Sequence, residues 1–215
     1  MKTHVRIIGD VHGLSERYLD LIKKSEYSLQ IGDMGFNYEF LNNVDPLHHK
    51  FIGGNHDNYD VIEECDNALG DFGVWSIPTF GDVFFVRGAW SIDWKMRTPG
   101  VDFWPDEELS MQKCAEALEL YTAIRPKMIV THGCPLEVVQ YVTNPIFAAN
   151  CGYTESVIKT RTSQLLQAMT EVHRPKIHIF GHFHVNFDSW IDGTRYICLG
   201  ECEVLDFPKK YVESL

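Results

Sequence analysis

Basic residues are scarce in this sequence, which has 19 Lys and Arg against 30 Asp and Glu and a formal net charge of −11. Proteins that bind along duplex DNA neutralise its phosphates with Lys and Arg, so we expect no extended nucleic-acid groove. A small phosphorylated ligand held by metal ions is compatible with this charge. The many carboxylates are themselves potential ligands for cations.

The sequence also lacks a long apolar run and a patterned set of cysteines. No segment approaches the roughly 18 apolar residues of a membrane helix. Asp10 and His12 interrupt the N-terminal apolar segment too early for a signal peptide. The six cysteines form no CxxC pair and suggest no secreted disulfide framework. We therefore expect a cytoplasmic protein with reduced thiols and no membrane partner.

The main pattern in the sequence is a set of five short apolar segments, each of which ends at a glycine or a histidine. Each predicts a β-strand, and each delivers a carboxylate, an amide or an imidazole at its carboxyl end. The segments are HVRIIGDVHG (4–13), YSLQIGDMG (27–35), HKFIGGNHD (49–57), KMIVTHG (127–133) and KIHIFGHFH (176–184). In sheets with helical crossovers, ligands collect beyond the carboxyl ends of the strands. The five polar ends are therefore expected to surround one site.

Helical patterns lie between and after these strands. Residues 14–24 predict a helix with Ser15 as its N-cap. Residues 105–124 predict a second helix, in which Pro105 lies near the start and acidic residues occupy the first turn. Residues 154–172 predict a third helix.

Additional β-structure is expected in residues 72–92, which are strand-rich, and in residues 187–200. The second of these segments carries Asp192–Gly193 at its centre, which is typical of the two-residue turn of a β-hairpin. No repeat or linker divides the chain, so we expect a single domain over residues 1–215. Alternating strands and helices followed by further strands predict an α/β fold with helices packed on a mixed, two-sheet core.

The five polar ends, taken in order, resemble the motifs of the calcineurin-like metallophosphoesterase family. They are Asp10-Val-His12, Gly32-Asp33, Gly54-Asn55-His56-Asp57, His132-Gly133 and Gly181-His182-Phe183-His184, within residues 9–184. A single one of these motifs is uninformative, whereas all five in this order are specific. The resemblance implies the family's sandwich of two mixed β-sheets flanked by helices and a phosphoesterase activity that depends on two metal ions.

The resemblance also assigns ligands to two divalent ions. One ion would be bound by Asp10, His12, Asp33 and His184, and the other by Asp33, Asn55, His132 and His182. Asp33 would therefore bridge the ions. Mixed carboxylate and imidazole ligands suit Mn²⁺, which we expect, with Fe, Zn, Ni or Co as alternatives. Two ions about 3.5–4 Å apart can clamp a phosphoryl group and generate hydroxide from water.

The resemblance makes His56 a catalytic group that stabilises or protonates the leaving oxygen, a role that suits imidazole. Asp57 would orient His56 through a ring N–H, although a plain turn residue would look the same in the sequence. A buried thiol is expected at Cys134 rather than a metal ligand. His178 is expected to be structural, although it alternates with His182 along its strand.

The segment 87–108 contains two arginines and three tryptophans whose roles stay open at this point: Arg87, Arg97, Trp90, Trp94 and Trp104. They could form a substrate-binding wall, with an arginine on phosphate and an aromatic ring on a planar group. Alternatively, they could belong to a loop that closes the sandwich.

Two departures from related enzymes bear on the substrate. The second motif, GDMGFN at residues 32–37, lacks the arginine of the serine/threonine phosphatases, and Asp57 stands where those enzymes have a glutamate. The chain is more similar to small stand-alone phosphoesterases of bacteria and phages. We therefore expect a small phosphorylated substrate, either a phosphodiester or a nucleotide-like molecule. A phosphatase-like phosphomonoesterase and an inactive binding scaffold are the alternatives, and the oligomeric state stays open.

Overall fold

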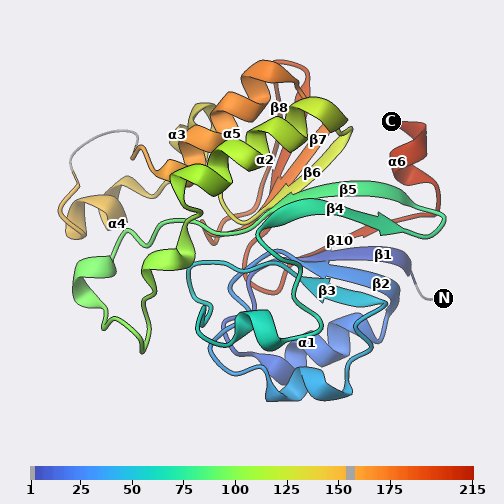
Figure 1. Cartoon of the computed structure of the whole chain (residues 1–215), viewed down its shortest axis with the longest axis horizontal. Helices are drawn as coiled ribbons and strands as arrows, with labels where there is room; N and C mark the ends of the chain where they lie inside the picture. The colour runs from blue at the N-terminus through green and yellow to red at the C-terminus, as the bar shows by residue number, and fades with distance from the viewer. Residues whose placement is uncertain (1–2, 154–157) are drawn as a thin grey trace.

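The computed structural model describes residues 3–153 and 158–215, which form two β-sheets with helices against their outer faces (Figure 1). One sheet has the strand order β10-β1-β2-β3, with bounds Val204–Phe207, Thr3–Ile8, Ser25–Gln30 and His49–Phe51. The other has the order β4-β5-β6-β7-β9-β8. Its bounds are Phe72–Ile77, Gly81–Val86, Met128–Thr131, Ile177–Phe180, Thr194–Cys198 and Phe187–Ile191.

Both sheets are mixed, as the sequence predicted. Strands β1, β2 and β3 run parallel, as do β5, β6, β7 and β9. Strands β10, β4 and β8 run antiparallel to their neighbours. The carboxyl ends of parallel strands share one edge of a sheet. The polar ends of β1, β2 and β3 therefore share an edge in one sheet, and those of β6 and β7 share an edge in the other.

The helices are α1 (Ser15–Ile22), α2 (Met111–Ile124), α3 (Leu136–Val142), α4 (Pro145–Asn150), α5 (Arg161–Val172) and α6 (Tyr211–Ser214). Short 3₁₀ turns are η1 (Glu39–Asn43), η2 (Ile62–Glu64), η3 (Trp94–Met96) and η4 (Pro105–Glu107). Helix α1 packs against the smaller sheet, and α2 and α5 pack side by side on the larger one (Figure 1). Within the described residues, none of these helices is long and apolar enough to cross a membrane.

The predicted helix starts need three corrections. Ser15 is the first residue of α1 rather than its N-cap, and Leu14 precedes it without a side-chain cap. The segment 105–124 is not one helix, because η4 ends at Glu107 and α2 starts only after Ser110, which caps it. The third helix starts at Arg161, and residues 154–157 of the predicted range lie outside the described residues.

The break before α2 has a physical cause in two buried carboxylates. Glu107 accepts hydrogen bonds from the backbone N–H and the hydroxyl of Ser91, at 2.6 and 2.7 Å. Glu108 accepts one from the backbone N–H of Thr162, at 2.6 Å. These contacts hold Glu108 in an extended conformation and delay the helix. The hairpin prediction is confirmed, since Asp192 and Gly193 link β8 to β9 with positive φ angles of 47° and 88°.

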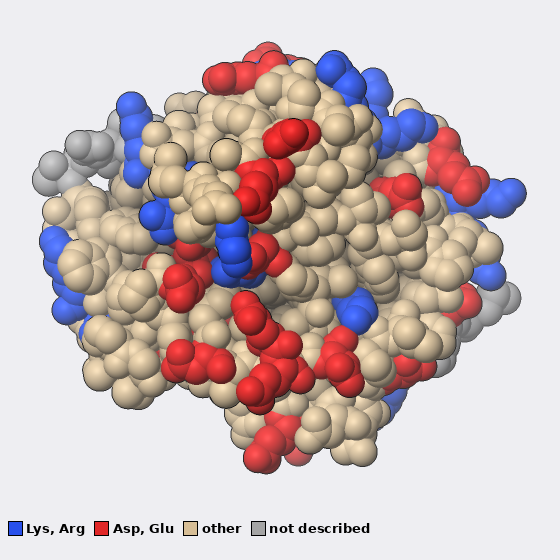
Figure 2. Space-filling model, viewed as in Figure 1, with Lys and Arg blue, Asp and Glu red and all other residues tan. Residues whose placement is uncertain are grey.

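Acidic side chains gather near the middle of the face shown in Figure 2, whereas Lys and Arg are scattered singly or in small groups. No continuous band of basic residues crosses this face. The distribution is in keeping with the net charge of −11.

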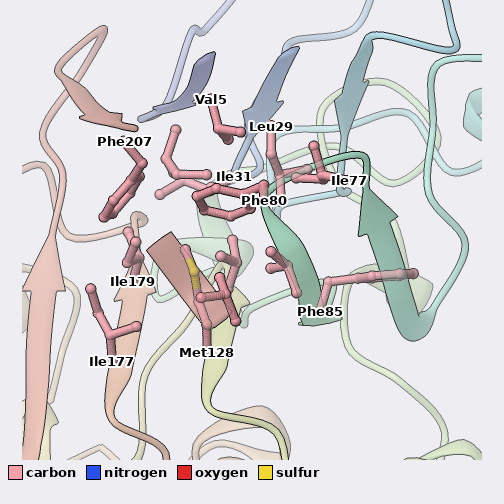
Figure 3. Close-up of a cluster of buried hydrophobic side chains, with 14 of the residues drawn as sticks. Val5, Leu29, Ile31, Ile77, Phe80, Phe85, Met128, Ile177, Ile179 and Phe207 are labelled. Carbon is pink, nitrogen blue, oxygen red and sulfur yellow. The ribbon is translucent and has the colours of Figure 1, made fainter. Parts of the chain in front are cut away.

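The main hydrophobic core lies between the two sheets (Figure 3). Val5 and Leu29 of the smaller sheet and Met128, Ile177 and Ile179 of the larger one point into it and are buried. On the outer faces of the sheets, further apolar clusters pack under α1 on one side, with Ile8 and Phe51, and under α2 and α5 on the other, with Phe84 and Ile129. Parallel strands buried on both faces are rigid supports, so the residues at their ends are held in fixed positions.

Candidate metal centre

The ends of β1, β2 and β7 bring the first predicted ligand group together. His184 Nε2 lies 3.4 Å from Asp10 Oδ2 and 3.0 Å from His12 Nε2. His12 Nε2 lies 3.6 Å from Asp33 Oδ2. The ligand atoms of these four residues all lie within 4.8 Å of one another, so one ion could contact all of them. They form a candidate metal site that joins the two sheets.

The second predicted group converges beside the first. Asn55 Oδ1 lies 2.7 Å from His182 Nδ1 and 3.1 Å from His132 Nε2. His132 Nε2 lies 3.1 Å from Asp33 Oδ1. Asp33 therefore faces one group with Oδ2 and the other with Oδ1. A carboxylate that bridges two ions needs this arrangement.

The residues fit a pair of divalent cations on electrostatic grounds. Asp33 Oδ2 is buried and has no hydrogen-bond partner among the described residues, which is costly for a carboxylate oxygen unless a cation contacts it. Burial raises the pKa of Asp10 to about 8, and a bound cation would reverse this by stabilising the charged form. Burial also lowers the pKa of His12 and His182, which keeps their rings in the neutral form that binds metals.

The backbone at the strand ends adopts strained left-handed conformations, which direct the predicted ligands toward one another. Four predicted ligands have left-handed φ angles: His12 at 46°, Asp33 at 60°, His182 at 69° and His184 at 54°. Such conformations cost about 1–3 kcal/mol for residues other than glycine and cluster at active sites. The adjoining glycines leave room for the ligands. A Cβ at Gly54 would lie 2.2 Å from Asp33 Oδ1, and one at Gly181 would lie 2.2 Å from Asp10 Oδ1.

Two partners fix the orientations of His132 and Asn55. His132 Nδ1 lies 2.8 Å from the carbonyl oxygen of Ile31, which leaves Nε2 facing Asp33. Asn55 Nδ2 donates to Ser91 Oγ at 3.2 Å, and Ser91 in turn donates to Glu107. This relay turns Asn55 Oδ1 toward the two histidines. Neither Ser91 nor Glu107 was predicted from the sequence to belong to the site. The one signal for Ser91 is its position in the GAWSID segment, residues 88–93, which also carries Trp90 and Asp93.

His56 lies at the edge of the two ligand groups. Its ring packs edge-on against that of His12, with centroids 4.9 Å apart. Arg97 donates to it, with Nη2 2.5 Å from His56 Nε2, and also pairs with Asp93 at 2.7 Å. Burial lowers the pKa of His56 to about 4, and the charge of Arg97 adds to this effect. An almost buried cation is thus placed beside the predicted catalytic histidine.

Some residues of segment 87–108 are structural, as in a loop that closes the sandwich, and others line the cavity, as in a substrate-binding wall. Arg87 is structural, because it pairs with Asp71 at 2.5 Å and lies over the ring of Tyr59. Trp104 is buried, and its indole N–H donates to Asp60 at 2.8 Å. In contrast, Arg97 and Trp90 line the cavity beside the metal centre.

The prediction that Asp57 orients His56 is wrong. Its carboxylate is fully buried and accepts hydrogen bonds from the backbone N–H groups of Gly54 at 2.7 Å and Asp33 at 2.9 Å. The hydroxyl of Tyr38 donates to it at 2.9 Å. Asp57 closes its own turn because the buried N–H groups there need an acceptor. It therefore ties the ends of β2 and β3 together, and the turn-residue alternative holds.

Cys134 and His178 have the structural roles that the sequence predicted. Cys134 is buried, and burial raises the pKa of its thiol well above the usual value. His178 is buried with Nε2 2.8 Å from the hydroxyl of Thr131. All six cysteines are free thiols.

Comparisons with known proteins agree with this geometry. The family model of the calcineurin-like phosphoesterases matches residues 3–186. No curated protein matches the sequence. Among solved structures, a dimetal phosphatase from Danio rerio is 13% identical with a TM-score of 0.56, over 94% of this chain and 88% of that one. The phosphopantetheinyl hydrolase of Mycobacterium tuberculosis is 17% identical with a TM-score of 0.53, over 93% and 90%.

At these identities the solved structures establish the fold, whereas the family model covers most of the chain and includes all five motifs. The two mixed sheets and the four-residue candidate metal site are in keeping with it. The chain therefore belongs to the calcineurin-like phosphoesterase family and is a metal-dependent hydrolase of phosphoric esters.

Proposed function

We propose that this protein hydrolyses a small phosphodiester at a centre of two Mn²⁺ ions. The observation that carries the proposal is the position of Asp33, whose two oxygens face two separate groups of ligands. When bound, two ions activate water and polarise the phosphoryl group. The free thiols are compatible with the cytoplasmic location that we expect.

The roles of the chain's own residues follow from their positions around this centre. Asp33 would hold both ions, and Asn55 would contribute a neutral oxygen that adds no charge to repel phosphate. His56 faces the substrate, and the phosphate anion beside it favours the imidazolium form that donates a proton to the leaving oxygen. Arg97 lies 2.5 Å from the His56 ring and donates hydrogen bonds to a non-bridging phosphate oxygen. The phosphate then replaces part of the contact between Arg97 and His56.

The charges near the centre favour a diester over a monoester. A phosphomonoester carries about −1.5 to −2 charges at neutral pH, whereas a diester carries one. Among the described residues that line the cavity, Arg97 is the single Lys or Arg, and Asp93 partly neutralises it. The missing arginine of the second motif also argues against a phosphatase-like phosphomonoesterase. A nucleotide-like diester belongs to the same reaction class.

A substrate panel tests this proposal. Protein stripped of metal and reloaded with Mn²⁺ is assayed on bis(4-nitrophenyl) phosphate, 4-nitrophenyl phosphate, cyclic nucleotides, dinucleoside polyphosphates, a phosphopeptide and short DNA. We expect two bound ions per chain, no turnover without metal and a higher kcat/KM for the chromogenic diester than for the monoester. A preference for the monoester would make the protein a phosphomonoesterase. Two bound ions without turnover of any ester would favour a binding scaffold.

A further inference from the structure

A cavity of about 440 Å³ begins at the metal centre and extends away from it. Asp33, Asn55 and His182 line one part of the cavity. The other part runs between the segment 89–97, the helices α3 and α4, and residues 158–163. Because the cavity is continuous with the candidate metal site, a group attached to a phosphate at that site would occupy it.

The part of the cavity away from the metals is apolar. Its lining includes Ile92, Val139, Val142, Phe147 and Ile158, which we call the apolar wall. Val139 and Val142 are buried and belong to a hydrophobic cluster under α3. Phe147 of α4 stands at the rim with half of its surface exposed. These residues offer no hydrogen-bonding side chain to a ligand.

Four of the polar residues that line the cavity already have hydrogen-bond partners within the protein. The hydroxyl of Thr143 donates to the Val139 carbonyl at 2.9 Å. The Asn144 side chain accepts from the first backbone N–H groups of α4. Thr160 and Ser163 form the capping box of α5. Such groups are poorly placed to read the edge of a nucleobase or the hydroxyls of a sugar.

The charged groups of the cavity are confined to its metal end. Arg97 and Asp93 form an ion pair of 2.7 Å there, next to His56. A phosphate therefore finds metals and a cation at one end, and an attached group meets the apolar wall at the other.

We propose that the cavity binds an apolar arm of the substrate, so that one ester group of the phosphodiester is an alkyl chain or an aryl ring. The inference rests on the proposed phosphodiesterase function and narrows it from phosphodiesters in general to those with an apolar arm. A nucleoside arm would bury its hydrogen-bonding groups against the apolar wall without partners, which is unfavourable.

A homologous series of substrates tests the proposal. The Mn²⁺-loaded protein is assayed on 4-nitrophenyl methyl, propyl and hexyl phosphates and on the 4-nitrophenyl ester of thymidine 5′-phosphate. The leaving group is constant, so only the retained arm varies. We expect kcat/KM to rise about three- to fourfold per buried methylene until the cavity is filled. The thymidine ester should be a poorer substrate than the hexyl ester.

A matched pair of variants on α4 locates the effect. Phe147→Asp places a charge at the rim of the apolar wall and should reduce the hexyl-to-methyl ratio of kcat/KM by at least about tenfold. Ile146→Asp changes a neighbour that is 73% exposed and does not line the cavity, so its ratio should equal that of the wild type. Both residues are exposed enough for the variants to fold.

Each outcome has a defined meaning. Three results would overturn the inference and leave the phosphodiesterase activity in place. They are equal kcat/KM for all alkyl esters, a higher kcat/KM for the thymidine ester, or the same hexyl-to-methyl ratio in Phe147→Asp as in the wild type. If no ester is hydrolysed, the proposed function fails instead. Calorimetry with methylphosphonate and hexylphosphonate on the Mn²⁺-loaded protein then tests the cavity separately. Tighter binding of hexylphosphonate supports the apolar arm, and equal binding excludes it.

Discussion

The metal centre and the apolar wall meet at Asn55 and His56, yet the chain builds them in different ways. The predicted ligands all lie within four residues of the carboxyl end of a strand. The apolar wall comes from loops, from α3, which packs on the larger sheet, and from α4, which lies at the periphery (Figure 1). A rigid centre with a peripheral wall allows one reaction to be combined with different substrates.

This difference also explains how much could be predicted from the sequence. The strand ends could be predicted because their pattern is local: an apolar run, a break and a ligand. The two mixed sheets followed from the alternation of strands and helices, and the fold class is confirmed. The role of Arg97 could not be predicted, since it meets His56 across 41 residues of chain and no local pattern encodes that contact.

Asp57 shows the limit of motif reasoning inside the metal centre itself. Its position after His56 suggested a partner for the ring, but buried backbone N–H groups compete for the same carboxylate. Five donors nearby occupy it: the N–H groups of Asp33, Met34, Gly35 and Gly54 and the Tyr38 hydroxyl. Which donor binds a carboxylate depends on the three-dimensional turn, and the order of residues alone does not determine it.

Asp33→Asn should have the largest effect, because it removes the charge that both groups of ligands share. We expect the loss of both ions and of at least about 10⁴-fold in kcat/KM, since the electrostatic stabilisation that two ions supply is lost with them. Metal analysis after dialysis and an assay at saturating Mn²⁺ measure the two effects. Glu64→Gln, at an exposed position, is the control. Near-normal turnover of Asp33→Asn would remove the bridging role.

His56→Ala should separate chemistry from metal binding at the junction of the two regions. We expect two bound ions and a loss of about 10²–10⁴-fold in kcat, the usual contribution of general acid catalysis. The loss should be smaller for a nitrophenyl ester than for an alkyl ester, because nitrophenolate leaves without a proton. Lost metal would instead make His56 a ligand. Equal losses on both esters would leave it as a phosphate-binding group.

Gly181→Ala tests how closely the strand ends fit the ligands. The new Cβ would lie 2.2 Å from Asp10 Oδ1, so Asp10 must move. We expect Mn²⁺ to bind the first site at least about tenfold more weakly, and the free energy of unfolding to fall by about 1–3 kcal/mol. Gly70→Ala, where a Cβ would meet nothing within 4 Å, should change neither quantity. Unchanged Mn²⁺ titration of Gly181→Ala would show that Asp10 has room to shift.

Ser91→Ala tests whether the segment 89–97 reaches into the metal centre, and its expected effect is confined to the second ion. Ser91 Oγ accepts from Asn55 Nδ2 at 3.2 Å and donates to Glu107 at 2.7 Å, so its removal frees the Asn55 amide to rotate. We expect the affinity for the second ion to fall about 10–100-fold, as is usual when a partner that orients a ligand is lost. The first ion should bind as in the wild type.

Two measurements distinguish this positioning role from a general loss of stability. A two-site Mn²⁺ titration should show one weakened step, and excess Mn²⁺ should restore most of kcat. Ser76→Ala removes a hydroxyl that donates to Asp82 at 2.7 Å on exposed β-structure, and it should leave both steps unchanged. If both ions of Ser91→Ala are weakened equally, the serine supports the fold as a whole. If neither is weakened, Asn55 keeps its orientation through His132 and His182 alone, and the metal centre is independent of the segment 89–97.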